Sequence, residues 1–172
     1  DKYLQTTSTW DTGEVWHTYE ALGELSGTST TGLSPNTEHT IEAKAKNQSG
    51  QTTAYGSSQN LYTLANDSGV STIFATSTTE IDLVLDINSN PTSTEFSICK
   101  TSDSASCDSG GYVQADGTLD TSQIWRSYTL WGTTTTLSSL SPATQYQFLA
   151  QARNGDNTES SLSSASNQVY TY

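Results

Sequence analysis

Basic residues are scarce in this chain of 172 residues. Six Lys and Arg stand against 18 Asp and Glu, and the formal net charge at pH 7 is −12. A chain of this charge repels phosphate backbones, so we expect no nucleic-acid partner. No apolar run approaches the ~20 residues of a membrane-spanning helix, so we expect no membrane insertion. No basic segment followed by an apolar one opens the sequence, which we interpret as a mature or trimmed form.

Charged residues of both signs are also few, at 14% of the chain. Polarity comes instead from hydroxyl and amide side chains, and Ser and Thr together make up about a third of the residues, unlike an ordinary cytosolic domain. This composition predicts an extracellular or cell-surface protein.

Cysteine occurs only twice, at Cys99 and Cys107 in "CKTSDSASC". A short disulfide loop at the end of a hairpin is the favoured interpretation, and two free thiols are the alternative. A metal site is not expected, because His17 and His39 are far from the cysteines and from each other in the sequence.

The sequence repeats itself. "GLSPNTEHTIEAKAKNQSG" from Gly32 matches "SLSPATQYQFLAQARNGDN" from Ser139, and upstream "EVWHTY" (14–19) matches "QIWRSY" (123–128). The matched positions lie about 108 residues apart, which is the size of a β-sandwich module. Within each copy apolar and polar residues alternate with a period of two, as in a half-buried strand.

The second copy contains short alternating segments separated by turn residues, which predicts an all-β fold. The clearest is "EIDLVLDI" (80–87), with Ile81, Leu83, Leu85 and Ile87 facing inward. Other expected strands are listed by range: 71–77, 94–100, 111–115, 122–130, 133–140, 144–154 and 167–172. Seven or more strands in about 105 residues fit a sandwich.

"LSPATQYQFLAQARNGDN" resembles the late-strand signature of fibronectin type III domains. The resemblance implies an immunoglobulin-like β-sandwich in which Tyr146 makes a corner hydrogen bond, and in which Phe96 is the aromatic residue of the third strand. It implies almost nothing about function. The family's usual second-strand Trp is missing, and we expect the matched Trp16 and Trp125 to fill the core instead. In the first copy His39 replaces the corner tyrosine.

Trp10 and Trp131 have no matching Trp in the other copy. We interpret them as exposed residues for a subunit contact or for stacking on a sugar, a hypothesis that fails if both are buried.

The first copy has no counterpart of residues 66–110, which hold the first strands and the cysteine loop. We therefore predict two tandem fibronectin type III-like sandwiches: 1–65 as the C-terminal part of one that lacks its N-terminal strands, and 66–172 as a complete one. Trimming of a longer repeat protein, completion by a neighbouring chain and disorder of the first copy are the alternatives, the last disfavoured by the preserved strand pattern.

No catalytic residue is predicted. His39 matches Tyr146 at a structural corner and His17 matches Arg126 on an outward face, so a Ser–His–Asp arrangement is not expected. Calcium is a weak alternative at 115–120 and 11–13, where Asp-Gly turns are the simpler interpretation. We expect no cofactor other than covalent glycans, at the sequons of Asn47 and Asn66 or on the Thr-rich runs.

Together these features predict a structural, non-enzymatic subunit of an extracellular filament, fibril or cell-surface array. It would be a disulfide-containing glycoprotein that associates with itself into a homopolymer. A neighbouring chain or a missing segment would complete the first sandwich. The alternative function is a non-catalytic spacer or carbohydrate-binding segment of a larger secreted enzyme or adhesin.

Overall fold

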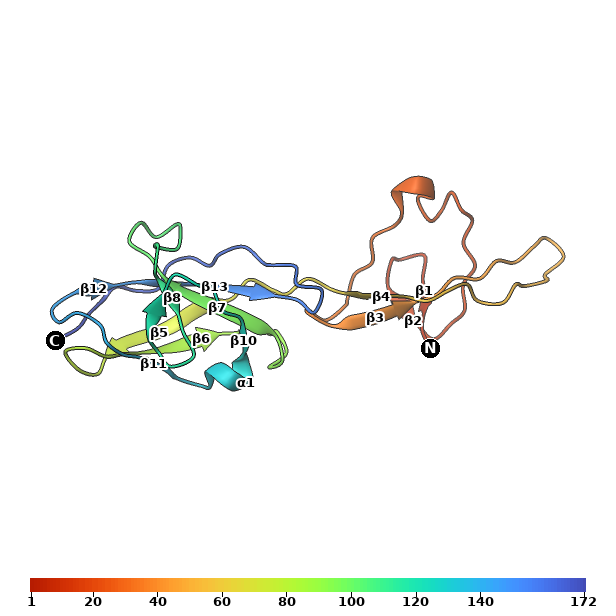
Figure 1. The fold of residues 1–172 in the computed structure, drawn as a ribbon. Coiled ribbons are helices and arrows are strands. Elements are labelled where there is room, and N and C mark those ends of the chain that lie inside the picture. The colour runs from red at the N-terminus through yellow and green to blue at the C-terminus, as the bar shows by residue number, and fades with distance from the viewer. The chain divides into compact units, whose positions relative to one another are not determined.

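The computed structural model describes residues 1–172 and divides the chain into two compact units (Figure 1). The first unit comprises Asp1–Ser34 and His39–Leu61, and the second comprises Pro35–Glu38 and Tyr62–Tyr172. The boundary predicted between residues 65 and 66 remains a prediction.

The first part of the chain forms few regular elements. They are β1 (Tyr3–Leu4), β2 (Trp10–Asp11), the 3₁₀ turn η1 (Glu24–Ser26), β3 (Glu38–Ile41) and β4 (Gln59–Tyr62). β1 pairs with β2 in a hairpin, and β3 pairs with β4.

The remaining elements belong to the second unit. They are β5 (Gly69–Ala75), β6 (Ile81–Asp86), β7 (Glu95–Lys100), β8 (Tyr112–Val113), β9 (Leu119–Asp120), β10 (Arg126–Ser127), α1 (Tyr128–Trp131), β11 (Thr135–Leu137), β12 (Gln145–Tyr146), β13 (Phe148–Arg153) and β14 (Val169–Tyr170). Neither η1 nor α1 has the length and apolar character needed to cross a membrane.

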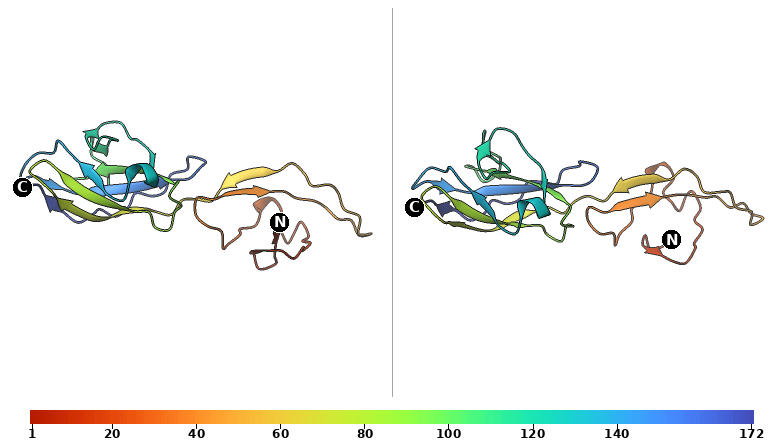
Figure 2. Two further views of the ribbon diagram at one scale, coloured as in Figure 1. Left: turned by 90° about the horizontal axis from the view of Figure 1, so that it is seen from below. Right: turned by 60° about the horizontal axis from the view of Figure 1, so that its bottom comes forward.

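The second unit is a sandwich of two larger sheets, with β12 and β14 paired separately (Figure 2). One sheet has the order β11-β6-β5; the other has β10-β7-β8-β9, with β13 also paired to β7. Alternate residues of β6 (Ile81, Leu83, Leu85) and of β7 (Phe96, Ile98) are buried in one shared core. The predicted alternation of residues 80–87 is confirmed, because a strand with one buried face places every second side chain inward.

The segment after β13 pairs with it through serine side chains. Ser160, Ser163 and Ser166 each accept a hydrogen bond at Oγ from a backbone N–H of β13, at 2.9–3.1 Å. Their own N–H groups donate to carbonyls of β13 at 2.8–2.9 Å. The spacing of three residues takes the place of the period-two ladder of a regular strand.

Tyr146 makes the predicted corner: its hydroxyl accepts a hydrogen bond of 2.9 Å from the backbone N–H of Ser141. In the first unit His39 holds the matching position, and its Nε2 is buried without a hydrogen-bond partner. The corner therefore differs between the two copies, as the substitution of tyrosine by histidine requires.

The prediction for the tryptophans of the second unit is wrong in a definite way. Trp131 is only 5% exposed and joins the core, whereas Trp125 is half-buried under the guanidinium of Arg153. Trp131 reaches the core because residues 128–130, predicted as the end of a strand, form with it the single helical turn α1. Its indole Nε1 donates a hydrogen bond of 2.9 Å to the carbonyl of Phe96.

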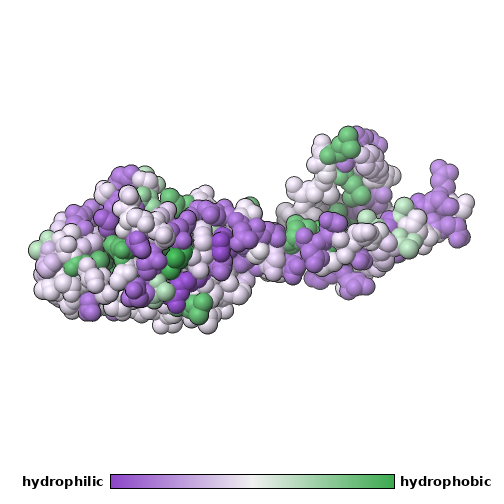
Figure 3. All heavy atoms as spheres, viewed as in Figure 1, coloured by the Kyte–Doolittle hydropathy of each residue, from purple (hydrophilic) through white to green (hydrophobic).

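The first unit has no core of its own, since no residue among 1–61 is buried. The face predicted to be inward is open to solvent, and Ile41 on it is 40% exposed. Hydrophobic residues accordingly reach the surface of this unit in Figure 3. The physical reason is that nothing in the unit corresponds to β5 and β6, which cover the same face in the second unit.

Candidate functional site

The second unit provides a reference for what the first unit lacks. Its strand β7 lies between β13 and β8, pairing antiparallel with both. Along β13, Arg153 lies opposite Glu95, and Ala152 lies opposite Phe96. β7 is therefore the strand that joins the β8–β9 hairpin to the rest of its sheet.

The first unit reproduces the hairpin on one side of this strand. Tyr3 pairs with Asp11, as Tyr112 pairs with Asp120. Gln5 donates from Nε2 to the carbonyls of Tyr3 and Gly13 at 3.0 and 2.8 Å. The matching Gln114 donates to the carbonyls of residues 112 and 122 at 3.1 and 2.8 Å.

The strand on the other side is also reproduced. The carbonyls of Ala43 and Ala45 accept hydrogen bonds of 2.8 and 2.9 Å from Gly56 and Thr53. The matching Ala150 and Ala152 accept bonds of 2.9 and 2.8 Å from residues 163 and 160. Residues 38–46 therefore have the same closed edge as β13.

The opposite edge of residues 38–46 is open. The backbone groups of Glu42 and Lys44 make no hydrogen bond, whereas β13 uses this edge to pair with β7. Between this edge and the hairpin lies a cavity of about 560 Å³, lined among others by Tyr3, Trp16, Glu42, Lys44 and Tyr55. We call this cavity and the edge beside it the open slot.

Charged and aromatic side chains flank the open slot. Lys44 pairs with Glu14 at 2.5 Å, and Lys46 lies 4.5 Å from the centroid of the Trp16 ring. The ion pair holds the pKa of the Glu14 carboxyl below its ordinary value and raises the pKa of the Lys44 amine. A hydrogen bond with Tyr55 raises the pKa of the Tyr3 phenol.

In the second unit a cation also lies over a matching tryptophan ring, and this cation has a carboxylate partner as well. Arg153 lies 4.8 Å from the centroid of Trp125 and also pairs with Glu95 of β7 at 2.6 Å. Lys46 occupies the position of Arg153 and makes no ion pair. The carboxylate that would complete its surroundings belongs to the strand that the first unit lacks.

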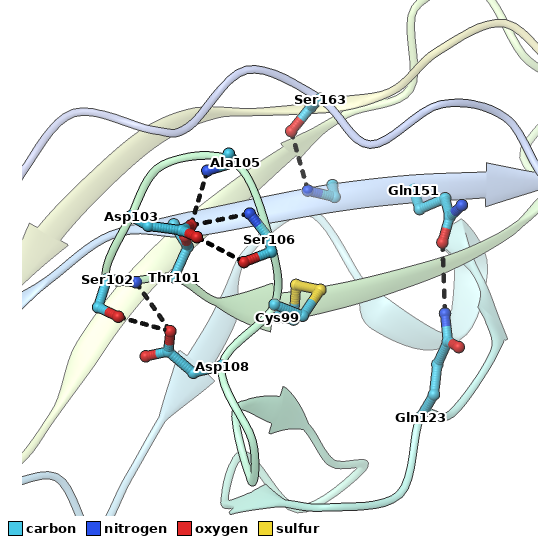
Figure 4. Close-up of a disulfide and its surroundings, with 12 residues drawn as sticks. Cys99, Thr101, Ser102, Asp103, Ala105, Ser106, Asp108, Gln123, Gln151 and Ser163 are labelled. Carbon is cyan, nitrogen blue, oxygen red and sulfur yellow. Dashed lines mark hydrogen bonds between the residues drawn. A yellow bond between two sulfur atoms is a disulfide. The ribbon is translucent and has the colours of Figure 1, made fainter.

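The predicted disulfide between Cys99 and Cys107 is confirmed, with a Cα–Cα distance of 5.5 Å. Figure 4 shows that two aspartates fix the loop from inside. Asp103 accepts backbone hydrogen bonds of 2.9 and 2.8 Å from Ala105 and Ser106, and Asp108 accepts one of 2.9 Å from Ser102. Hydrogen bonds from the Ser106 hydroxyl, Ala105 and Thr101 hold the pKa of Asp103 well below 3.8.

Replacing Cys99 and Cys107 together by serine should lower the free energy of unfolding of the second unit by about 2–3 kcal/mol, because a loop of this length loses its covalent constraint in the unfolded chain. Urea denaturation followed by circular dichroism measures the loss. The unsubstituted chain under reducing agent serves as the control and should show a similar loss. An unchanged denaturation midpoint in both cases would contradict the prediction.

The other predicted site residues stay predictions, and the structure gives only their positions. Asn47 is exposed and its Oδ1 accepts a hydrogen bond of 2.9 Å from the N–H of Gln51. Asn66 is exposed and its Nδ2 donates to the carbonyl of Asn88 at 3.0 Å, while Ser68 of the same sequon is 6% exposed. Whether either asparagine carries a glycan is a matter for mass spectrometry.

The aspartates weighed as calcium ligands make local turns. Asp116 accepts hydrogen bonds from the backbone and hydroxyl of Thr118, and Asp11 accepts one of 2.7 Å from the N–H of Thr12. No three His, Cys, Asp or Glu side chains lie together as a group able to hold a metal ion. His17 is half-buried, with Nε2 2.9 Å from the carbonyl oxygen of Leu4, and His39 is also half-buried.

The open slot itself was only half foreseen. The repeat revealed that strands were missing, but the prediction did not identify Lys46 and Trp16 as a pair. The alignment contained the signal, because a cation and a Trp recur together at Arg153 and Trp125. Trp131, in contrast, is buried and so is not available for stacking on a sugar.

No protein-family model matches this sequence, and no curated protein matches it. Among solved structures, the FN1–FN3 domains of chicken CNTN1 share 18% identity over 81% of this chain and 44% of theirs, with a TM-score of 0.41. Domains d3–d4 of the rat CD45 extracellular region share 16% identity over 92% of this chain and 74% of theirs, with a TM-score of 0.42. The third fibronectin III domain of human KIAA0343 shares 16% identity over 59% of this chain and 77% of its own, with a TM-score of 0.35.

This chain spans less than half the length of the chicken structure. Its fold class follows from its own strand pairing: two sheets closed over one core, a tyrosine corner at Tyr146, and a second, partial copy of the same parts. The chain is an all-β tandem of fibronectin type III-like units, in which residues 1–61 hold counterparts of the later strands of the second unit.

Proposed function

We propose that this protein is a structural subunit of an extracellular filament, fibril or cell-surface array. The observation that carries the proposal is the open slot: the first unit keeps the strands on both sides of the missing one and buries none of its residues. An unpaired edge beside an exposed apolar face is normally protected in a protein that works alone. Assembly supplies that protection.

The proposed assembly has no catalytic role. Pairing between repeated sandwiches holds the assembly together. Strands from a neighbouring chain or from further repeats fill the first unit. Asn47 and Asn66 are the proposed glycosylation sites, both exposed, the first at a turn and the second in the segment before β5. The disulfide between Cys99 and Cys107 is compatible with an oxidising compartment, where such bonds persist.

Electron microscopy of the native material, isolated without refolding, tests this function. We expect filaments with a regular axial repeat, because a polymer built by one repeated contact has a constant step. Dispersed single particles would contradict the filament and favour a spacer segment of a larger protein. Removing glycans enzymatically before imaging is the control that separates protein contacts from glycan contacts.

A further inference from the structure

We infer that the open slot binds an extended strand of defined chemistry: an acidic residue first, then two large apolar residues at alternate positions, running antiparallel to residues 38–46. This inference rests on the proposed assembly and specifies its partner. The partner is a polypeptide segment outside these 172 residues that resembles Glu95–Lys100.

The direction and register of the strand come from the second unit. There β7 runs antiparallel to β13, with Glu95 opposite Arg153 and Ile98 opposite Ala150. Lys46 and Ala43 occupy the positions of Arg153 and Ala150 in the repeat. The incoming strand therefore begins opposite Lys46 and continues past Ala43.

The inward side chains of the strand must be large and apolar. In the second unit Phe96 and Ile98 are 0% and 1% exposed, and they lie opposite the small residues Ala152 and Ala150. The first unit offers Ala45 and Ala43 at the same places, so its own side chains leave room for bulky ones. Burying two such side chains is the main apolar gain of binding.

The outward side chains are set by charge. Lys46 lies over Trp16 and makes no ion pair, whereas Lys44 is paired with Glu14. A carboxylate at the first position of the strand completes an arrangement like that of Arg153, Glu95 and Trp125. The position opposite Lys44 takes a small polar residue, as Ser97 does opposite Gln151.

The test uses the 172-residue chain and a synthetic peptide with the sequence of residues 94–101, with serine at position 99. We expect saturable binding, seen as quenching or a shift of tryptophan fluorescence and as shifts of the Glu42 and Lys44 amide signals in NMR spectra. A scrambled peptide of the same composition is the control and should leave both signals unchanged.

A charge exchange tests the register. Lys46→Glu in the chain should weaken binding of the acidic peptide by roughly three- to tenfold, because an exposed ion pair becomes a repulsion. A peptide with lysine in place of its glutamate should bind the Lys46→Glu chain better than it binds the unsubstituted chain. Equal affinities across all four combinations would overturn the register and the acidic requirement.

The outcomes of these experiments distinguish failure of the proposed strand partner from failure of the proposed filament. Peptide binding without filaments in the native material would uphold the strand partner and refute the filament. Filaments that persist unchanged in saturating peptide, with no peptide bound, would refute the strand partner. Dimers that form by exchange of β7 between two copies, with no binding of the peptide, would also overturn the inference.

Discussion

Replacement of Trp131 by alanine is expected to lower the free energy of unfolding of the second unit by about 3–5 kcal/mol, the usual cost of removing a buried aromatic side chain. The side chain is 5% exposed and packs in the core. Its loss also leaves the carbonyl of Phe96 without its indole donor, which adds about 1–3 kcal/mol if no water replaces it. Guanidinium denaturation followed by far-ultraviolet circular dichroism measures the change.

Trp125 provides the matched control for this prediction. It is a tryptophan of the same sandwich, a few residues earlier, but it is half-buried and holds only Arg153 above its ring. Trp125→Ala should cost about 1 kcal/mol, the scale of a surface cation–π contact with partial burial. A larger loss at Trp125 than at Trp131 would reverse the assignment of the core tryptophan.

Joining a second copy of residues 66–110 to the amino end of the chain should give the first unit a cooperative unfolding transition of its own. The added segment supplies counterparts of β5, β6 and β7, which cover the apolar face and fill the open slot. A completed sandwich of this size should be stable by roughly 5 kcal/mol or more, the lower end for natural domains. Differential scanning calorimetry should show two transitions in place of one.

The control for this extension carries aspartate at the copy of Phe96. A charge at a position that is 0% exposed in the second unit prevents the core from closing, so the second transition should be lost. Hydrogen exchange gives an independent readout, because the amides of Glu42 and Lys44 become paired only when the slot is filled. Fast exchange at both amides in the intact extension would contradict the repeat-based register.

The repeat in the sequence predicted the fold well wherever burial alternates strictly along a strand. Ile81, Leu83 and Leu85 face the core because only one face of β6 is buried. The residue types along the strand alternate accordingly, with apolar residues on the buried face. The corner at Tyr146 was expected from the resemblance of its sequence to fibronectin type III domains, and the hydrogen bond from Ser141 confirms it.

The tryptophans show what a repeat cannot predict. Trp16 and Trp125 match because both carry a cation, Lys46 or Arg153, on their rings, and not because both are buried. Sequence equivalence identifies a shared role without stating whether that role is in the core. The repeat places Lys46 and Arg153 at matching positions, but only the strand register shows that these cations lie beside the tryptophan rings.

The helical turn α1 was missed because three of its four residues, Tyr128, Thr129 and Trp131, individually favour strands. A hydrogen bond of 2.9 Å from the N–H of Gly132 to the carbonyl of Tyr128 closes the turn, and the chain leaves it with Gly132 at a φ of 80°, a value that favours glycine. That turn directs Trp131 into the core.

The serine segment after β13 limits the geometry of any assembly. Its hydroxyls at Ser160 and Ser163 also donate to the carbonyls of Ser161 and Ser164, at 2.9 and 2.8 Å, so these carbonyls already have a partner within the segment. A neighbouring molecule finds no period-two row of free groups there. In the first unit, by contrast, the backbone groups of Glu42 and Lys44 make no hydrogen bond, so addition of a strand by a regular ladder is open there and closed along the serine segment.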